Sequence, residues 1–169
     1  MKILETDRLI LRWMSLADSE FMLELLNDPS WIRFIGDRGA RTPDDAGDYI
    51  LSKIVPLYER TGFGLLLTEL KSDGAPIGIC GLIKRDSLDD VDIGFAFLPT
   101  YRAHGYAFES ALAVMTYGRE VLGLNRIVAI TSLENDRSVR LLERLGFTFE
   151  KMITLFADGA DVMLFGSSV

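Results

Sequence analysis

The order of strand-like and helix-like segments constrains the fold of this chain of 169 residues more than any other feature. Hydrophobic periodicity, capping residues and turn signals predict the order β-α-α-β-β-β-α-β-α-β-β. Segments in this order predict a mixed sheet with helices packed on it, an α+β or α/β fold. No repeat, low-complexity tract or linker divides the chain, and a hydrophobic content of 49% suffices for one core. We therefore expect a single domain over residues 1–169.

The first half of the chain is predicted to hold a strand, two helices and a hairpin. Residues 8–13 alternate between apolar and polar side chains, which is typical of a strand. Ser15 is the expected N-cap of one helix, and Thr42, with a proline directly after it, is that of the next. Pro56 is expected to kink or end this second helix. Two apolar runs then flank Asp73-Gly74, a dipeptide that favours a tight hairpin turn.

The second half is predicted to alternate strands and helices. Residues 90–98 are typical of a strand, residues 108–122 of a helix and residues 126–132 of a buried strand. Asn135 is the expected N-cap of a last helix, and two final strands flank Asp158-Gly159. The apolar face expected for the helix at 108–122 consists of Ala111, Leu112, Met115, Val121 and Leu122.

The strand at residues 90–98 has two unlike faces. Large apolar side chains occupy alternate positions from Val91 to Phe97, while the positions between them hold the smaller Asp92, Gly94 and Ala96. A strand face without bulk allows another backbone or a ligand to approach closely. Packing of a neighbouring helix on that face is the alternative interpretation.

Charge and composition exclude several classes of partner. A net charge of −7 and a pI near 4.7 argue against a nucleic-acid-binding face and weakly favour cationic partners. The single cysteine, Cys80, lies in an apolar run and is predicted to be a small buried side chain. The N-terminus is not typical of a signal peptide, and no apolar stretch is long enough to span a bilayer. We expect a soluble cytoplasmic protein with no nucleic-acid or membrane partner and no metal site.

The stretch "YRAHGYAFES", residues 101–110, is suited to binding an anion. If a helix begins near Tyr106, the amides before it lack partners within the helix and point beyond its end. These donors and the helix dipole favour negative charge, Gly105 allows close approach, and Arg102 adds a positive charge. The spacing fits neither a Walker loop nor a dinucleotide fingerprint.

Three segments together resemble the GNAT superfamily of N-acetyltransferases. "FLPTYRAHGYA" is similar to its Arg/Gln-x-x-Gly-x-Gly/Ala signature, and "ENDRSVRLLERLGF" to its second conserved helix. The opening "ETDRLILRWMSLADSEFMLELLND" and "IGFAFLPTYRAHGYA" resemble the RimJ/RimL-type branch, which acetylates ribosomal-protein N-termini among other amines. The resemblance covers nearly the whole chain. It implies a mostly antiparallel central sheet flanked by helices, with a splayed strand pair that holds the cofactor.

The resemblance also implies acetyl-CoA as the cofactor and assigns its contacts. The pantetheine arm would lie along Ala96 and Phe97, and an amide near Phe97 would stabilise charge on the thioester oxygen. Asn135 would contact the cofactor near the thioester and also cap its helix. The pyrophosphate would lie on the loop formed by Arg102, Ala103, His104, Gly105, Tyr106 and Ala107.

Catalytic residues are less clearly implied. In many superfamily members a tyrosine protonates the leaving thiolate, but this chain has Leu142 at that position. Ser138 is the nearest hydroxyl that matches the pattern and is therefore the candidate proton donor. Its alternative role is packing in the first turn of the helix. Asp92 and Glu134 are candidates to relay a proton, against the simpler reading as solvated or capping carboxylates. His104 lies where phosphate is expected and would be a hydrogen-bond donor at most.

The expected acceptor is a primary amine. At pH 7 an α-amine of pKa about 8 loses its proton at a cost of about 1.4 kcal/mol, and a lysine of pKa about 10.4 at about 4.6 kcal/mol. A site without an obvious strong base therefore favours a peptide N-terminus. Residues 28–45 are expected to recognise it. A polyamine, an aminoglycoside or a non-catalytic acyl-CoA-binding module are the alternatives, and similar proteins are usually homodimers.

Overall fold

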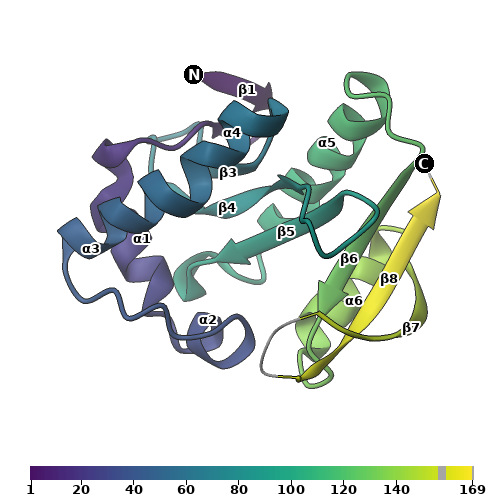
Figure 1. Cartoon of the computed structure of the whole chain (residues 1–169). Coiled ribbons are helices and arrows are strands. Elements are labelled where there is room, and N and C mark those ends of the chain that lie inside the picture. Colours follow the sequence, from purple (N-terminus) through teal and green to yellow (C-terminus); the bar gives the residue numbers. More distant parts are fainter. Residues whose placement is uncertain (156–158, 169) are drawn as a thin grey trace.

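A computed structural model describes residues 1–155 and 159–168 of the chain. Within these residues the centre is one eight-stranded sheet in the order β1-β2-β3-β4-β5-β6-β8-β7 (Figure 1). All neighbouring strands are antiparallel except β5 and β6, which are parallel. The predicted mixed, mostly antiparallel sheet is thus confirmed. The strands are β1 Lys2–Glu5, β2 Leu9–Arg12, β3 Leu65–Leu70, β4 Pro76–Ile83, β5 Asp92–Phe97, β6 Arg126–Thr131, β7 Thr148–Thr154 and β8 Asp161–Ser168.

Helices cover both faces of this sheet. In Figure 1, α4 crosses in front of β3 and β4, whereas α5 passes behind β5 and contacts β4 and β5. Helix α6 contacts β6 and lies on the same side as α5. No helix in the described part of the chain is long and apolar enough to cross a membrane. The helices are α1 Ser19–Leu26, α2 Pro29–Phe34, α3 Pro43–Tyr49, α4 Val55–Thr61, α5 Tyr106–Glu120 and α6 Asp136–Arg144.

The core is built around β4, whose residues from Ile77 to Ile83 are all buried. Its alternate side chains meet helices on opposite faces, so this central strand has apolar residues on both sides. Cys80 is fully buried among them, as predicted, and burial raises the pKa of its thiol to about 12.

Several local signals act as the sequence predicts. Thr42 caps α3 by accepting from the amide of Asp45, and Asn135 caps α6 by accepting from the amide of Ser138. The two runs around Asp73-Gly74 form the antiparallel β3–β4 hairpin. Ser15 also caps a helix, but the capped turn is a short 3₁₀ helix, Leu16–Asp18, that precedes α1.

Other details differ from the sequence prediction. Of the two alternatives expected at Pro56, a kink or an end, the structure excludes the end: the helical path continues from α3 through a π turn, Ile50–Ile54, into α4. Pro56 lies in the first turn of α4, where its missing N–H costs little. Strand β1, which pairs with β2, was not expected at all.

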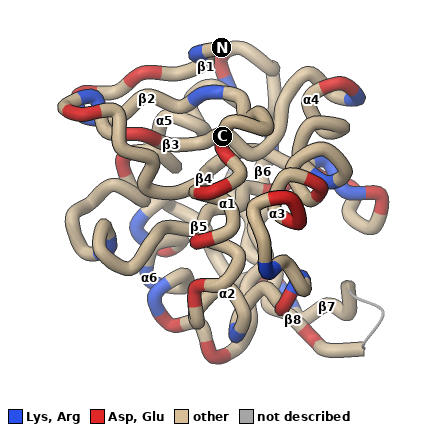
Figure 2. The backbone as a smooth tube through the Cα atoms, turned by 90° about the vertical axis from the view of Figure 1, so that its left-hand side faces the viewer, with Lys and Arg blue, Asp and Glu red and all other residues tan. Residues whose placement is uncertain are grey.

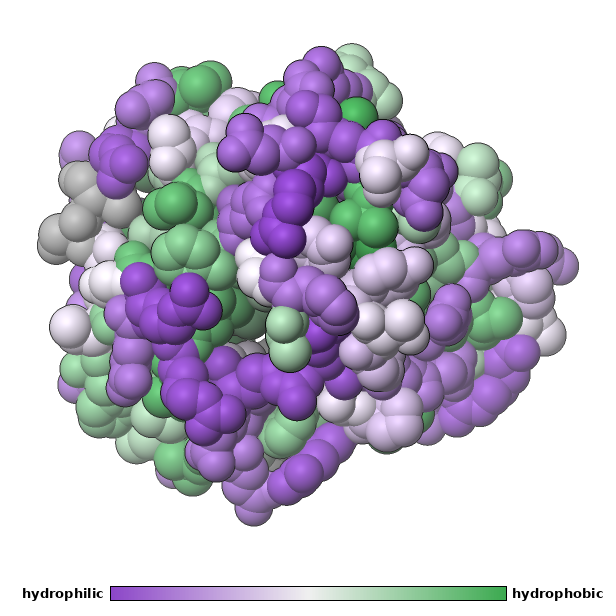
Figure 3. Space-filling model, turned by 180° about the vertical axis from the view of Figure 1, so that it is seen from behind, coloured by the Kyte–Doolittle hydropathy of each residue, from purple (hydrophilic) through white to green (hydrophobic). Residues whose placement is uncertain are grey.

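The prediction of which residues form the apolar face of α5 is partly wrong. Leu112 is 47% exposed and Val121 is 67% exposed, because neither continues the row of side chains that faces the sheet. Figure 3 shows this side of the molecule as a mainly hydrophilic surface with separate apolar patches. The residues of α5 that do pack inward are Ser110, Ala111, Val114, Met115 and Gly118.

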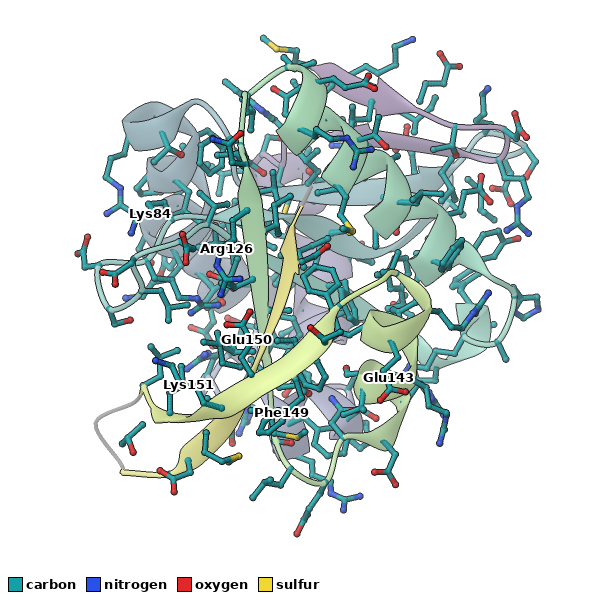
Figure 4. The ribbon with its side chains drawn as sticks, turned by 90° about the vertical axis from the view of Figure 1, so that its right-hand side faces the viewer. Lys84, Arg126, Glu143, Phe149, Glu150 and Lys151 are labelled. Atoms are coloured by element: carbon teal, nitrogen blue, oxygen red, sulfur yellow. The ribbon has the colours of Figure 1, made fainter. Side chains whose placement is uncertain are left out.

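An ion pair locks the C-terminal hairpin β7–β8 onto β6. Arg126 of β6 donates to both carboxylate oxygens of Glu150 on β7, at 2.7 and 2.6 Å, and these residues point toward each other in Figure 4. The pair crosses β8 above Gly166, where an added Cβ would lie 1.9 Å from Glu150. A side chain at this position would therefore displace the ends of the two ion-paired side chains. Asp158, expected in the hairpin turn, lies outside the described residues.

Candidate active site

Strands β5 and β6 diverge from a single point. They pair at Asp92 and Val128, where the amide of Val128 donates to the carbonyl oxygen of Val91 at 3.0 Å. By contrast, β4 pairs with β5 along the whole of Asp92–Phe97. The predicted splayed strand pair is therefore present, and it opens toward the carboxyl ends of both strands.

The divergence leaves one edge of β5 without a partner strand. Val91 bonds toward β6, and Leu98 on the other edge donates to Ile77 of β4 at 2.9 Å. Because backbone groups alternate along a strand, Ile93, Phe95 and Phe97 present their N–H and C=O groups to the opening. The backbone of Ala96 faces β4 instead, where it pairs with Ile79.

The loop before α5 has the backbone shape of an anion site. Gly105, the N-cap of α5, has φ 82°, and Ala103 has φ 63°. The first helical hydrogen bond runs from the amide of Glu109 to the carbonyl of Gly105 at 3.0 Å, so the preceding amides have no partner within the helix. Arg8 holds the loop in place, since it donates to the carbonyl of His104 at 3.0 Å and pairs with Glu109 at 2.6 Å.

The side chain of Arg102 is engaged by the protein itself. It donates to the carboxylate of Asp28 at 2.5 Å and to the carbonyl oxygen of Phe97 at 3.0 Å. Asp28 immediately precedes α2, so Arg102 joins the end of β5 to that helix. An arginine held in this way fixes the geometry of the loop. The donors that remain for an anion are the amides at the start of α5 that have no partner within the helix.

One large cleft of about 1140 Å³ brings most of the predicted site residues together. Its walls come from α2, α3 and the β4–β5 loop on one side of the sheet and from α5 and α6 on the other, with β5 and β6 between them. Ala103, His104, Gly105 and Tyr106 are not part of its lining. The predicted residues that line it are Asp92, Ala96, Phe97, Arg102, Ala107, Glu134, Asn135 and Ser138.

The two candidate carboxylates have very different surroundings. Asp92 is 1% exposed, accepts from Arg85 at 3.0 Å, and burial raises its pKa. Glu134 is 75% exposed and pairs with Arg33 of α2 at 3.2 Å. Asp92 is thus the candidate whose protonation the protein controls, whereas Glu134 is a solvated carboxylate at the rim.

The family of this chain follows from its sequence, and the splayed strands and the cleft agree with it. Residues 8–148 match the family described as Acetyltransferase (GNAT) domain. The chain belongs to the GNAT acetyltransferase family. The prediction of an acetyl-CoA-dependent N-acetyltransferase is therefore confirmed.

Relatives of this GNAT protein agree with the assignment over nearly its full length. YoaA of Bacillus subtilis (strain 168), described as an uncharacterized N-acetyltransferase, is 30% identical over 89% of this chain and 85% of its own. RimL, a ribosomal L7/L12 alpha-N-protein acetyltransferase in complex with coenzyme A, has a similar fold with a TM-score of 0.84. It is 17% identical to this chain, over 100% of this chain and 98% of its own.

A second protein of known structure with this fold is named for a different class of amine. The spermidine N-acetyltransferase of Vibrio cholerae, in complex with CoA and spermine, has a TM-score of 0.76. It is 19% identical to this chain, over 96% of each chain. The same fold thus occurs in one enzyme named for a protein N-terminus and in another named for a polyamine.

Sequence reasoning missed residues of the cleft, among them Tyr49 and Arg85, because nothing in their local pattern indicates that they line it. Trp31 also lines the cleft and lies within residues 28–45, where recognition of the acceptor is expected from the sequence. Among the described residues, four side chains bury a polar atom without a partner, and three of them line the cleft. Unsatisfied buried groups of this kind are costly and concentrate at functional sites. The three are Trp31, Asp92 and Ser132.

Proposed function

We propose that this acetyltransferase transfers the acetyl group of acetyl-CoA to the α-amine of a peptide or protein N-terminus. The observation that carries the proposal is the cleft that runs through the gap between β5 and β6. It gives the cofactor and the acceptor separate approaches that meet between the two strands. Acetyl-CoA supplies an acetyl group activated as a thioester.

The residues of the cleft and of the adjoining loop before α5 fit coenzyme A. Unpaired amides at the start of α5 suit a diphosphate, and the left-handed backbone at Ala103 and Gly105 turns them outward. The outer edge of β5 has N–H and C=O groups at Ile93 and Phe95 that suit the amides of the pantetheine arm, which would add like a strand. The N–H of Phe97 is placed to stabilise negative charge on the acyl oxygen.

The carboxylates of the cleft are paired with arginines, which favours a peptide N-terminus over a polyamine as the acceptor. Asp28 is held by Arg102, Glu134 by Arg33 and Asp92 by Arg85, and all six residues line the cleft. A polycation would have to compete with these arginines, whereas an N-terminus carries one amine followed by neutral peptide groups. A cleft whose buried carboxylates, Asp28 and Asp92, are each paired with an arginine also suits an amine of low pKa better than lysine.

Two side chains have proposed roles in proton transfer. Asp92 would take the proton that the acceptor amine loses, because one of its oxygens is buried without a partner. Ser138 would supply a proton to the leaving sulfur, since it lies in the first turn of α6 beside the cap of Asn135 and lines the cleft. Glu134 stays a candidate only for relaying protons to solvent.

A polyamine is the second candidate acceptor. Helix α3 brings Asp45 and Asp48 to the wall of the cleft, and Figure 2 shows acidic residues in red along this helix. The net charge of −7 also favours a cationic acceptor. Asp45, however, already accepts from the amides of Arg41 and Thr42.

Release of free thiol from acetyl-CoA, measured across a panel of acceptors, tests the proposal. The panel contains peptides with a free N-terminus and no lysine, the same peptides with a blocked N-terminus, spermidine and free lysine. Turnover that requires the free N-terminus supports the proposal. Turnover with spermidine alone favours the second candidate, and tight binding of coenzyme A without any turnover favours a non-catalytic binding module.

A further inference from the structure

Arg85 follows β4 and contacts the buried carboxylate at the start of β5. Its Nε donates to Oδ1 of Asp92 at 3.0 Å, and both residues line the cleft. The side chain of Arg85 is 32% exposed, so it joins a buried group to the open part of the cleft. Oδ2 of Asp92 is buried and has no partner in the described part of the protein. One oxygen of the carboxylate is therefore fixed, and the other is free to accept a proton.

The residues paired with Asp92 on the two neighbouring strands are apolar. Asp92 lies opposite Ile83 on β4 and beside Val128 on β6, at the point where β5 and β6 diverge. An isolated carboxylate in such surroundings would be protonated at neutral pH and unable to act as a base. Arg85 opposes this effect, because an adjacent cation favours the charged form.

Two further groups interact with this pair. Lys84, which lies on the side of the sheet away from α5 and α6 in Figure 4, donates to the carbonyl oxygens of Arg85 and Leu88. It also lowers the pKa of Asp92, less than Arg85 does. Tyr49 of α3 interacts electrostatically with Arg85, and burial raises the pKa of its hydroxyl. Tyr49 is therefore neutral at pH 7, and Arg85 is the cation in contact with Asp92.

We infer that Arg85 is a positioning residue that keeps Asp92 ionised and oriented, so that its free oxygen takes the proton from the acceptor ammonium. The inference rests on the proposed function. In this step the N–H bond breaks, its electron pair stays on nitrogen, and the proton goes to Oδ2, directly or through one water molecule. The amine is then neutral and nucleophilic.

Three arginine variants and two measurements test the role of Arg85. Arg85→Gln removes the charge, Arg85→Lys keeps it, and Arg60→Gln is the matched control, since Arg60 contacts the same loop through the carbonyl of Lys84. The first measurement is the carbon-13 NMR titration of the Asp92 carboxyl, which Asp92→Asn identifies and which needs neither cofactor nor acceptor. The second is the pH profile of kcat/KM with a peptide acceptor.

Arg85→Gln is expected to raise the pKa of Asp92 by about one to three units and to move the acidic limb of the rate profile by the same amount. Activity should recover at higher pH, and Arg85→Lys and Arg60→Gln should stay close to the parent protein. An unchanged Asp92 titration would overturn the inference, as would a shifted titration with an unmoved rate profile. Absence of turnover with every amine would instead overturn the proposed function. The NMR titration distinguishes the two failures, because it reports the effect of Arg85 on Asp92 without any turnover.

Discussion

Arg102 and Asp28, which are 74 residues apart in sequence, form a nearly buried ion pair at 2.5 Å. The arginine also donates to the carbonyl oxygen of Phe97 at 3.0 Å. The pair therefore fixes α2 to the end of β5 and to the loop that precedes α5. An arginine expected from the sequence to add positive charge to an anion site thus also fixes, in this structure, the architecture of the site.

The first prediction concerns the stability contributed by this pair. Asp28→Asn and Arg102→Met should each lower the free energy of unfolding by about 3 kcal/mol, because each leaves a charged or polar partner buried without compensation. The double variant should lose less than the sum of the two. Urea denaturation of all four proteins measures the coupling. The exposed pair Lys2–Glu5 is the control, and additive losses for Arg102 and Asp28 would contradict the structural role.

The second prediction separates backbone strain from anion binding at the two ends of α5. Gly105 precedes the helix with φ 82°, and Gly123 follows it with φ 71°. Glutamate at either position costs about 1 kcal/mol of backbone strain. Only Gly105→Glu adds bulk and negative charge beside the free amides, so only this variant should lose coenzyme A binding in calorimetry. Equal affinities of the two variants would place the diphosphate elsewhere.

The third prediction concerns Ser138. Ser138→Ala should lower kcat by about a hundredfold while the Kd of coenzyme A changes less than about twofold, as expected for a proton donor. Thr116→Val is the control, because Thr116 lies on α5 outside the cleft lining and its hydroxyl donates to the carbonyl of Leu112 in the same helix. Equal rates for Ser138→Ala and the parent protein would remove this serine from the mechanism.

The fourth prediction concerns stability at alkaline pH. Burial raises the pKa of Cys80 from 9.0 to about 12, so the folded protein keeps a proton that the unfolded chain loses first. This contribution is fully present below pH 9 and is lost as the pH rises through about 12. Cys80→Ala should therefore make the decline of unfolding free energy between these pH values shallower by up to about 1.4 kcal/mol per pH unit. Parallel declines would show that the thiol ionises equally in both states.

The elements that bury one regular face were predictable from the sequence. The caps at Thr42 and Asn135 and the hairpin at Asp73-Gly74 are local, so a few neighbouring residues determine them. Strand β1 gives no such signal, because it has four residues with charged ends and only partly buried centres. It is stabilised by pairing with β2, a tertiary contact that periodicity does not record.

The site was predictable where its chemistry depends on the backbone. The free amides before α5 follow from Gly105 and the start of a helix, both visible in the sequence. The contacts of Arg102 with Asp28 and of Arg33 with Glu134 join segments that are far apart in the chain, so no local sequence pattern predicts them. For the same reason the sequence indicates Asp92 as a candidate but not the arginine that holds it.

A crystal structure of the protein with coenzyme A tests the central claim most directly. The account predicts density for the diphosphate against the amides of residues 103–107 and for the pantetheine arm along Ile93, Phe95 and Phe97, in the gap between β5 and β6. A cofactor bound outside this gap, or a gap closed by pairing of β5 with β6 beyond Asp92 and Val128, would contradict it.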